Sequence, residues 1–239
     1  MSAQLVATVH LAEEEISGEA GPASDRLRIE GVTKHWGNRP VLDSVGLRAG
    51  AGELVALVGA NGAGKTTLLR IVAGLIYPER GTVEFDEIDL RSQRREYMRR
   101  VGFVSAGQVA LYARLSVEHH LEYWSRIAFV PRSGRRDAIE TAIEQFELRD
   151  LRGRRVERLS MGQRQRVRLA MCLMHKPSLL LLDEPRTSLD AAGTEVLAQA
   201  LRASLAAGAT VIWCAPDVQD PCVDPGSVYR LSNGRLVGE

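Results

Sequence analysis

A glycine-rich run contains the residue types that bind phosphate groups and a metal ion. Glycines let backbone N–H groups turn inward around phosphate oxygens, because no side chain blocks the approach. A lysine can reach the β- and γ-phosphates of a nucleotide, and the threonine after it can bind Mg²⁺. The run fits the pattern G-x-x-x-x-G-K-[ST]. The expected nucleotide-binding residues, which we call the phosphate loop, are Gly59, Ala60, Asn61, Gly62, Ala63, Gly64, Lys65, Thr66 and Thr67.

Two acidic residues after the apolar run Leu179–Leu182 could complete this site. Asp183 stands at the end of an expected buried strand and is expected to bind Mg²⁺ together with Thr66. Glu184 is the expected catalytic residue, as a general base on the attacking water. Acidic residues are common at strand ends, so the pair predicts nucleotide hydrolysis only in combination with the phosphate loop.

Short apolar runs predict the strands that position these groups. Leu54–Val58 directly precedes the phosphate loop and is typical of a strand buried on both faces, and a helix-like stretch, Thr67–Leu75, follows. Strands that alternate with helices imply a mainly parallel α/β sheet. Further strands are expected at Val101–Val104, Leu179–Leu182 and Ala209–Trp213, with two β-like runs before them at Leu27–Val32 and Val41–Leu47.

The chain is expected to form one domain with a terminal tail. Residues 1–25 contain several acidic residues but no Lys or Arg, which predicts a mobile acidic tail. Residues 26–239 are expected to form a single nucleotide-binding domain, since they contain no internal repeat. The part from about 112 to 160 is helical in pattern, which predicts a helical subdomain inserted into the α/β core.

Charge and composition exclude several other classes of protein. The formal net charge is only +1, so binding to nucleic acid is not expected. No apolar run approaches the roughly 20 residues of a membrane-spanning helix, and the start of the chain does not resemble a signal peptide. The three cysteines show no C-x-x-C pairing, which favours thiols in a reducing cytosol. Any membrane part is therefore expected to belong to another chain.

The segment Leu159–Gln163 reads L-S-M-G-Q and resembles the signature of the ABC ATPases. Arg166 and Leu169–Ala170 continue the match, and the interval to Asp183 is the one that this family uses. The chain thus resembles the ATP-binding subunits of ABC transporters over roughly residues 27 to 237. The resemblance implies a P-loop NTPase (RecA-like) fold: a mainly parallel α/β sheet core, an N-terminal antiparallel β-subdomain and the inserted helical subdomain. It also implies ATP and Mg²⁺ as cofactors.

Three further positions match motifs of that family. Ser188 and Asp190, in Ser188-Leu189-Asp190, look like its D-loop. Trp36 matches the aromatic position on which adenine stacks; a tryptophan buried in the core is the alternative.

The resemblance also implies partners. Two cassettes, in a homodimer or a heterodimer, would pair head to tail, each ATP touching the phosphate loop of one and Ser160, Gly162 and Gln163 of the other. A serine hydroxyl and backbone N–H groups at a helix start suit an anion such as a γ-phosphate. The cassette would be the motor of a separate transmembrane subunit, at the cytoplasmic face of the membrane. Glu184–Gly193 is similar to single-cassette exporters, so export is the expected direction.

Two positions depart from the family pattern. Pro216 stands where a histidine usually follows the strand after the D-loop, and it has no side-chain donor for the γ-phosphate. After Val101–Val104 the family usually places a glutamine two residues on, but here Gln108 comes two residues late. Gln108 is either a displaced Q-loop glutamine or a polar loop residue. Slow hydrolysis, or the weaker site of an asymmetric heterodimer, is therefore expected.

Two other functions stay open. One is a soluble, non-transport ABC ATPase that acts on DNA or ribosomes, although such proteins usually have two cassettes or a long coiled coil. The other is a regulatory nucleotide-binding subunit with a degenerate site.

Overall fold

An antiparallel sheet forms one side of the molecule. The computed structural model describes residues 25–107, 111–219 and 221–238, so the predicted tail (except Asp25) and Gln108 lie outside the described residues. The sheet has the order β2-β1-β4-β5. Its strands are β1 (Leu27–Trp36), β2 (Arg39–Ala49), β4 (Arg80–Phe85) and β5 (Ile88–Asp89).

A second sheet has six strands in the order β10-β9-β3-β8-β7-β6. Its strands are β3 (Leu54–Val58), β6 (Val101–Val104), β7 (Leu179–Asp183), β8 (Thr210–Ala215), β9 (Ser227–Ser232) and β10 (Arg235–Gly238). Neighbouring strands from β9 to β6 are parallel, and β10 is antiparallel to β9. The carboxyl ends of β3, β7 and β8 therefore lie at the same edge.

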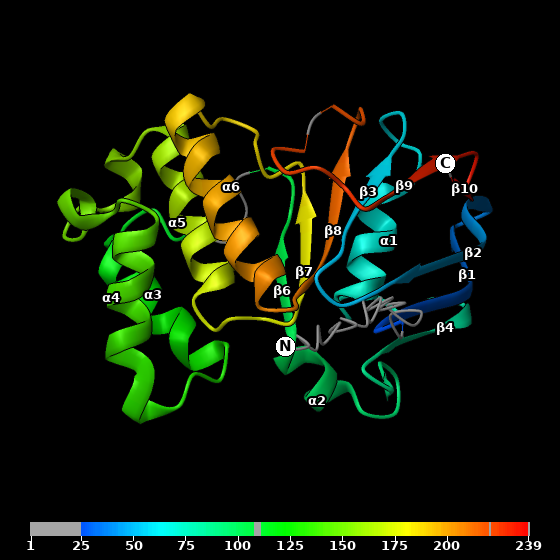
Figure 1. Cartoon of the computed structure of the whole chain (residues 1–239), viewed down its shortest axis with the longest axis horizontal. Coiled ribbons are helices and arrows are strands. Elements are labelled where there is room, and N and C mark those ends of the chain that lie inside the picture. The colour runs from blue at the N-terminus through cyan, green and yellow to red at the C-terminus, as the bar shows by residue number, and fades with distance from the viewer. Residues whose placement is uncertain (1–24, 108–110, 220, 239) are drawn as a thin grey trace, which may run out of the picture.

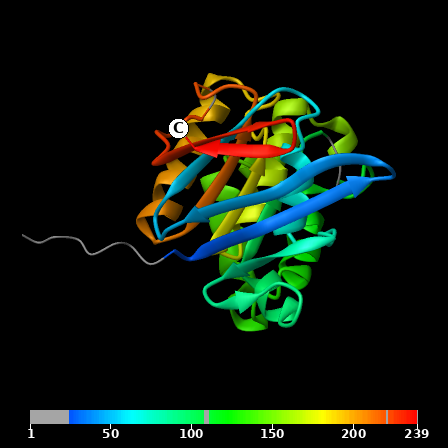
Figure 2. The same cartoon turned by 90° about the vertical axis from the view of Figure 1, so that its right-hand side faces the viewer.

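Each face of this sheet is covered by a different layer. Helix α1 (Lys65–Val72) and the antiparallel sheet pack on one face, and α5 (Met161–Leu173) and α6 (Ala191–Ala206) pack on the other (Figure 1). Strands β1 and β2 cross in front of the parallel strands in Figure 2. Side chains of β7 alternate between the two cores, as the period of two in a strand requires: Leu180 and Leu182 in one, Leu179 and Leu181 in the other.

The helices α3 (Val117–Ile127) and α4 (Arg135–Gln145) lie between β6 and β7 in the chain and pack against α5. Short 3₁₀ turns accompany them at Arg132–Gly134, Arg149–Leu151 and Val156–Arg158, and α2 (Arg94–Arg99) precedes β6. Over the described part of the chain, no helix is long and apolar enough to span a bilayer.

The predicted fold class is confirmed, and the strands β3, β6 and β7 lie where the apolar runs predict them. The helix after the phosphate loop differs from its predicted range, Thr67–Leu75. It begins at Lys65, because Gly64 ends the loop with a left-handed φ of 109°. It ends at Val72, close to Gly74 with φ 69°.

Candidate functional site

The phosphate loop connects the end of β3 to the start of α1. Gly64 has φ 109°, and a Cβ atom there would lie 2.9 Å from the carbonyl oxygen of Val41, so only glycine fits. No side chain caps the start of α1. The helix N-terminus therefore offers its backbone N–H groups and its dipole to an anion.

The Lys65 side chain is buried beneath this loop, with 6 % of its surface exposed. Its ammonium group donates to the carbonyl oxygens of Gly59 at 2.5 Å and Ala60 at 3.2 Å. These bonds hold the positive charge at the loop, where a phosphate oxygen could replace a carbonyl as acceptor.

Thr66 and Asp183 come together at the edge of the sheet. The Thr66 hydroxyl donates to the Asp183 carboxylate at 2.8 Å, and only 1 % of Asp183 is exposed. The backbone N–H of Ala106 lies 3.4 Å from the same carboxylate oxygen. Mg²⁺ usually takes one or two protein oxygens, with water and phosphate oxygens completing its shell, so this pair fits the ion.

Glu184 has a strained backbone beside that pair. Its φ is +49°, a left-handed value that is uncommon for a residue with a long side chain. Its N–H donates to the Cys214 carbonyl at 3.0 Å, and its own carbonyl accepts from Thr187 N–H at 3.1 Å. These bonds hold the turn that directs Glu184 toward the phosphate loop.

A pocket of about 440 Å³ is lined by Lys65, Thr66 and Glu184. Other residues of the phosphate loop line it too. Arg39 and Val41 also line it and were not predicted, because neither belongs to a motif that marks a ligand. The remaining lining residues are Trp36, Asn61, Gly62, Gly64 and Thr67.

Trp36 lies at the end of β1 with 53 % of its surface exposed. The alternative of a core tryptophan is therefore excluded. The Lys34 ammonium lies 5.2 Å from the centre of the ring, and the pocket of the phosphate loop is adjacent. An exposed indole at this place could stack on a planar base.

Pro216 is exposed and directly follows β8, the strand between β3 and β7. Ala215 pairs with Val58, and Cys214 pairs with Asp183, so Pro216 lies between the phosphate loop and the acidic pair. Of the histidines that the structure describes, none lines the pocket.

The signature residues lie apart from this pocket. Ser160 caps α5: its hydroxyl accepts from Gln163 N–H at 3.2 Å, and the Gln163 side chain accepts from Ser160 N–H at 3.0 Å. A Cβ atom on Gly162 would lie 2.8 Å from the Ser188 carbonyl oxygen, so glycine lets this helix approach Ser188. Asp190 caps α6 by accepting from Gly193 N–H at 2.8 Å.

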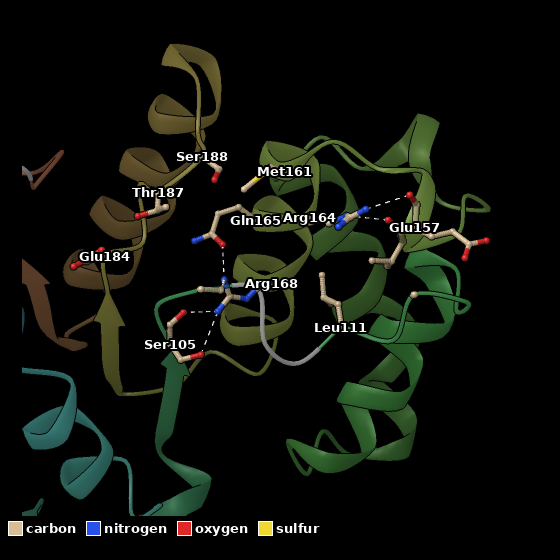
Figure 3. A pocket seen from close by; sticks show the side chains of 13 residues that line it. Ser105, Leu111, Glu157, Met161, Arg164, Gln165, Arg168, Glu184, Thr187 and Ser188 are labelled. Atoms are coloured by element: carbon tan, nitrogen blue, oxygen red, sulfur yellow. Dashed lines mark hydrogen bonds between the residues drawn. The ribbon is translucent and has the colours of Figure 1, made fainter.

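A second pocket lies between helix α5 and the segment after β6 (Figure 3). Glu184, Thr187 and Ser188 line one side of it, and Gln165 and Arg168 of α5 line another. Neither Gln165 nor Arg168 was predicted, because on an amphipathic helix both are typical of a solvated face.

Known proteins resemble this chain over most of its length. A family model described as "ABC transporter" matches residues 42–187. The ABC transporter ATP-binding protein NatA of Bacillus subtilis is 32 % identical over 81 % of this chain and 78 % of NatA. The sulfate/thiosulfate import ATP-binding protein CysA of Caulobacter vibrioides is 38 % identical over 88 % of this chain and 63 % of CysA.

A solved structure agrees with the sequence relatives. A dimeric structure of a post-hydrolysis state of the ATP-binding cassette MJ0796, bound to ADP and Pi, is 26 % identical. It superposes with a TM-score of 0.79 over 89 % of this chain and 97 % of that one. The phosphate loop, the acidic pair and the signature thus occur on the fold that these proteins share, and the chain belongs to the ABC transporter family as an ATP-binding subunit with the ATPase fold.

Proposed function

We propose that this subunit binds ATP with Mg²⁺ in the pocket of the phosphate loop and hydrolyses the ATP with Glu184 as general base. The observation that carries the proposal is the convergence of three features on one pocket. They are the Lys65 side chain, the Thr66 side chain, which donates to Asp183, and the Glu184 side chain.

Each part of ATP would meet a group suited to it. The triphosphate would accept hydrogen bonds from the phosphate loop, the N-terminus of α1 and Lys65. Adenine would stack on the exposed Trp36 ring, which lines the same pocket.

Thr66 and Asp183 would hold Mg²⁺. When bound, Mg²⁺ neutralises charge on the phosphate oxygens. Glu184 would accept a proton from water as the water oxygen attacks the γ-phosphorus. The bond from that phosphorus to the bridging oxygen would break, leaving ADP and phosphate.

A second cassette would complete the site. Ser160, Gly162 and Gln163 do not line the pocket of the phosphate loop within one chain. The Ser160 oxygen accepts from Gln163 N–H, which leaves its own O–H proton for a γ-phosphate oxygen. The MJ0796 cassette with ADP and Pi is dimeric, which supports such a pair, and we propose a second copy of this chain as the partner.

The work of hydrolysis would move a separate transmembrane subunit, with this subunit bound at the cytoplasmic face. We propose export as the direction, on the similarity of Glu184–Gly193 to exporter subunits. CysA is an import protein by name, so transport by membrane vesicles must be measured in both directions. A non-transport ABC ATPase with a long coiled coil fits this structure less well. Among the described residues the longest helix is α6 (Ala191–Ala206), which is too short for such a coiled coil.

Pro216 supports a slow reaction. A histidine at this position could donate to the γ-phosphate, and the loss of one well-aimed donor costs about 10²- to 10³-fold in rate. A regulatory subunit that binds ATP but scarcely hydrolyses it is the second candidate function, and this exposed proline is the observation that favours it.

Steady-state phosphate release from ATP tests the proposal. The wild type should hydrolyse ATP only with Mg²⁺, and Glu184→Gln should reduce the rate by about 100-fold or more with ATP affinity retained. A wild-type rate no higher than that of Glu184→Gln, with tight ATP binding in both, would favour the regulatory subunit.

A further inference from the structure

Arg168 is a buried cation on α5, with 8 % of the residue exposed, and it lines the second pocket. It donates to the carbonyl oxygens of Ser105 and Gly107, in the segment after β6, and to the Ser105 hydroxyl at 3.3 Å. The same guanidinium donates to the Gln165 side-chain oxygen at 2.8 Å (Figure 3).

This charge has no carboxylate partner among the residues that the structure describes. Burial lowers the pKa of the Arg168 guanidinium from its ordinary value. Among the described residues, its hydrogen-bond acceptors are neutral oxygens. If residues 105–107 moved away from α5, a buried donor group with a full charge would lose its acceptors, which is costly.

The contacts of Arg168 continue to both acidic residues of the nucleotide site. On one side, the N–H of Ala106, held between Ser105 and Gly107, lies 3.4 Å from the Asp183 carboxylate. On the other side, the Gln165 amide donates to the Pro185 carbonyl at 2.7 Å, in the turn that begins at Glu184. One buried guanidinium thus links the surroundings of both carboxylates to the signature helix.

We propose that Arg168 is a positioning residue for ATP hydrolysis, which fixes residues 105–107 and, through Gln165, the Glu184 turn against α5. The inference rests on the proposed function, because it assumes that Asp183 and Glu184 act in hydrolysis. Arg168 lines the second pocket and not the pocket of the phosphate loop. Its effect is on the rate of the step that needs both carboxylates in place, and not on ATP binding by the phosphate loop.

The steady-state kinetics of Arg168→Met test whether Arg168 affects the rate of hydrolysis and not ATP binding. The methionine fills similar space but donates no hydrogen bond. We expect kcat to fall about tenfold, within the range of coupling between sites, while KM and the ATP dissociation constant change less than about twofold. Arg168→Lys keeps the charge but has a single donor group, so its kcat should lie between those of Arg168→Met and the wild type.

Gln165→Leu tests the contact of Arg168 with the Glu184 turn, which runs through Gln165. If Gln165 and Arg168 act as one unit, the double variant should lose no more than Arg168→Met alone. Arg152→Met is the matched control, since Arg152 bonds to Glu118 and Glu140 within the helical subdomain. It should lower stability without changing kcat.

Hydrogen–deuterium exchange without nucleotide gives a readout that does not depend on catalysis. Arg168→Met, or Arg168→Lys if the first variant does not fold, should speed exchange at residues 105–107 and in the Glu184 turn, whereas Arg152→Met should not. The inference would be overturned if the Arg168 variants kept the wild-type kcat, or if they lost ATP affinity as much as they lost kcat. Unchanged hydrogen–deuterium exchange at residues 105–107 and in the Glu184 turn would also overturn it. A wild type without ATPase activity would instead overturn the proposed function, and the exchange result would still decide whether the link exists.

Discussion

Pro216 is the residue at which this nucleotide site departs most from a complete one. It lies between the phosphate loop and Glu184 at the edge of the sheet, and it offers no hydrogen-bond donor. Lys65, Thr66 and Glu184, which we propose to act in hydrolysis, line one pocket, so Pro216 should limit the rate and not the affinity for ATP.

Pro216→His should therefore raise kcat, by about tenfold or more, because an imidazole would add a donor near the γ-phosphate. Pro216→Ala is the control, since it restores the backbone N–H, as Pro216→His does, but adds no side-chain donor. Steady-state phosphate release at saturating ATP measures both. A fast wild type that Pro216→His does not improve would show that the site is not degenerate.

The nucleotide-binding residues are the part of the site that local sequence predicts well. Lys65 and Thr66 belong to one short motif and Asp183 follows a continuous apolar run, so each can be found locally although Thr66 and Asp183 lie 117 residues apart. Arg168 is different, because no motif contains it and its acceptor at Gly107 lies 61 residues earlier in the chain. Only the tertiary fold brings α5 beside the segment after β6, so no local pattern could reveal that contact.

Among the elements, the strands that are buried on both faces were the most predictable, the alternating strands β1 and β2 were predicted in part, and the half-exposed β4 and β9 were not predicted. Every residue of β3 and β7 is buried, so both appear as continuous apolar runs. Strand β4 buries only Val83 and Phe85, and β9 buries only Leu231, so neither gives a clear run or alternation. Their positions depend on pairing with distant strands.

A cluster of charges joins the antiparallel sheet to the rest of the fold. Asp86, in the turn between β4 and β5, accepts from Arg26 at 2.6 Å and 2.7 Å and from Arg100 at 2.7 Å. Arg26 also donates to the Gly208 carbonyl at 2.5 Å, after α6. The hydrogen bonds from Arg26 lower the pKa of the Asp86 carboxyl, although partial burial opposes them.

Asp86→Asn should lower the free energy of unfolding at pH 7 by about 1 to 3 kcal/mol. Since the folded-state pKa is depressed, this stabilisation is present above the unfolded value of about 3.9 and is lost as the pH falls through the folded-state pKa. Denaturant unfolding at pH 7, 5 and 3 measures it. Glu87→Gln, the next residue with φ +63°, is the control. Equal loss from both variants, or a loss from Asp86→Asn that grows as the pH falls from 7 to 3, would refute this role.

At the scale of the whole molecule, the parallel sheet separates two apolar cores. One contains Cys172 of α5, and the other contains Cys214 of β8. Burial raises the pKa of the Cys172 thiol to about 12 and that of Cys214 well above its usual value. Cys222 is only half-buried.

At pH 8, a disulfide reagent should thus modify at most Cys222 in the folded protein, because the thiolate is the reacting form. All three thiols should react in guanidinium. The number of thiols modified over time measures this. Rapid reaction of three thiols without denaturant would mean that the cores open readily.

The central claim is that each ATP lies between the phosphate loop of one copy and the signature of another. Sedimentation of Glu184→Gln with and without MgATP tests it most directly, because this variant should hold ATP without cleaving it. We predict a monomer without nucleotide and a dimer with MgATP. Adding Ser160→Asp should keep the cap of α5 but place a carboxylate against the γ-phosphate, so the dimer should be lost, whereas Ser160→Thr should retain it. A monomer at saturating MgATP, or a dimer that is indifferent to Ser160→Asp, would contradict the claim.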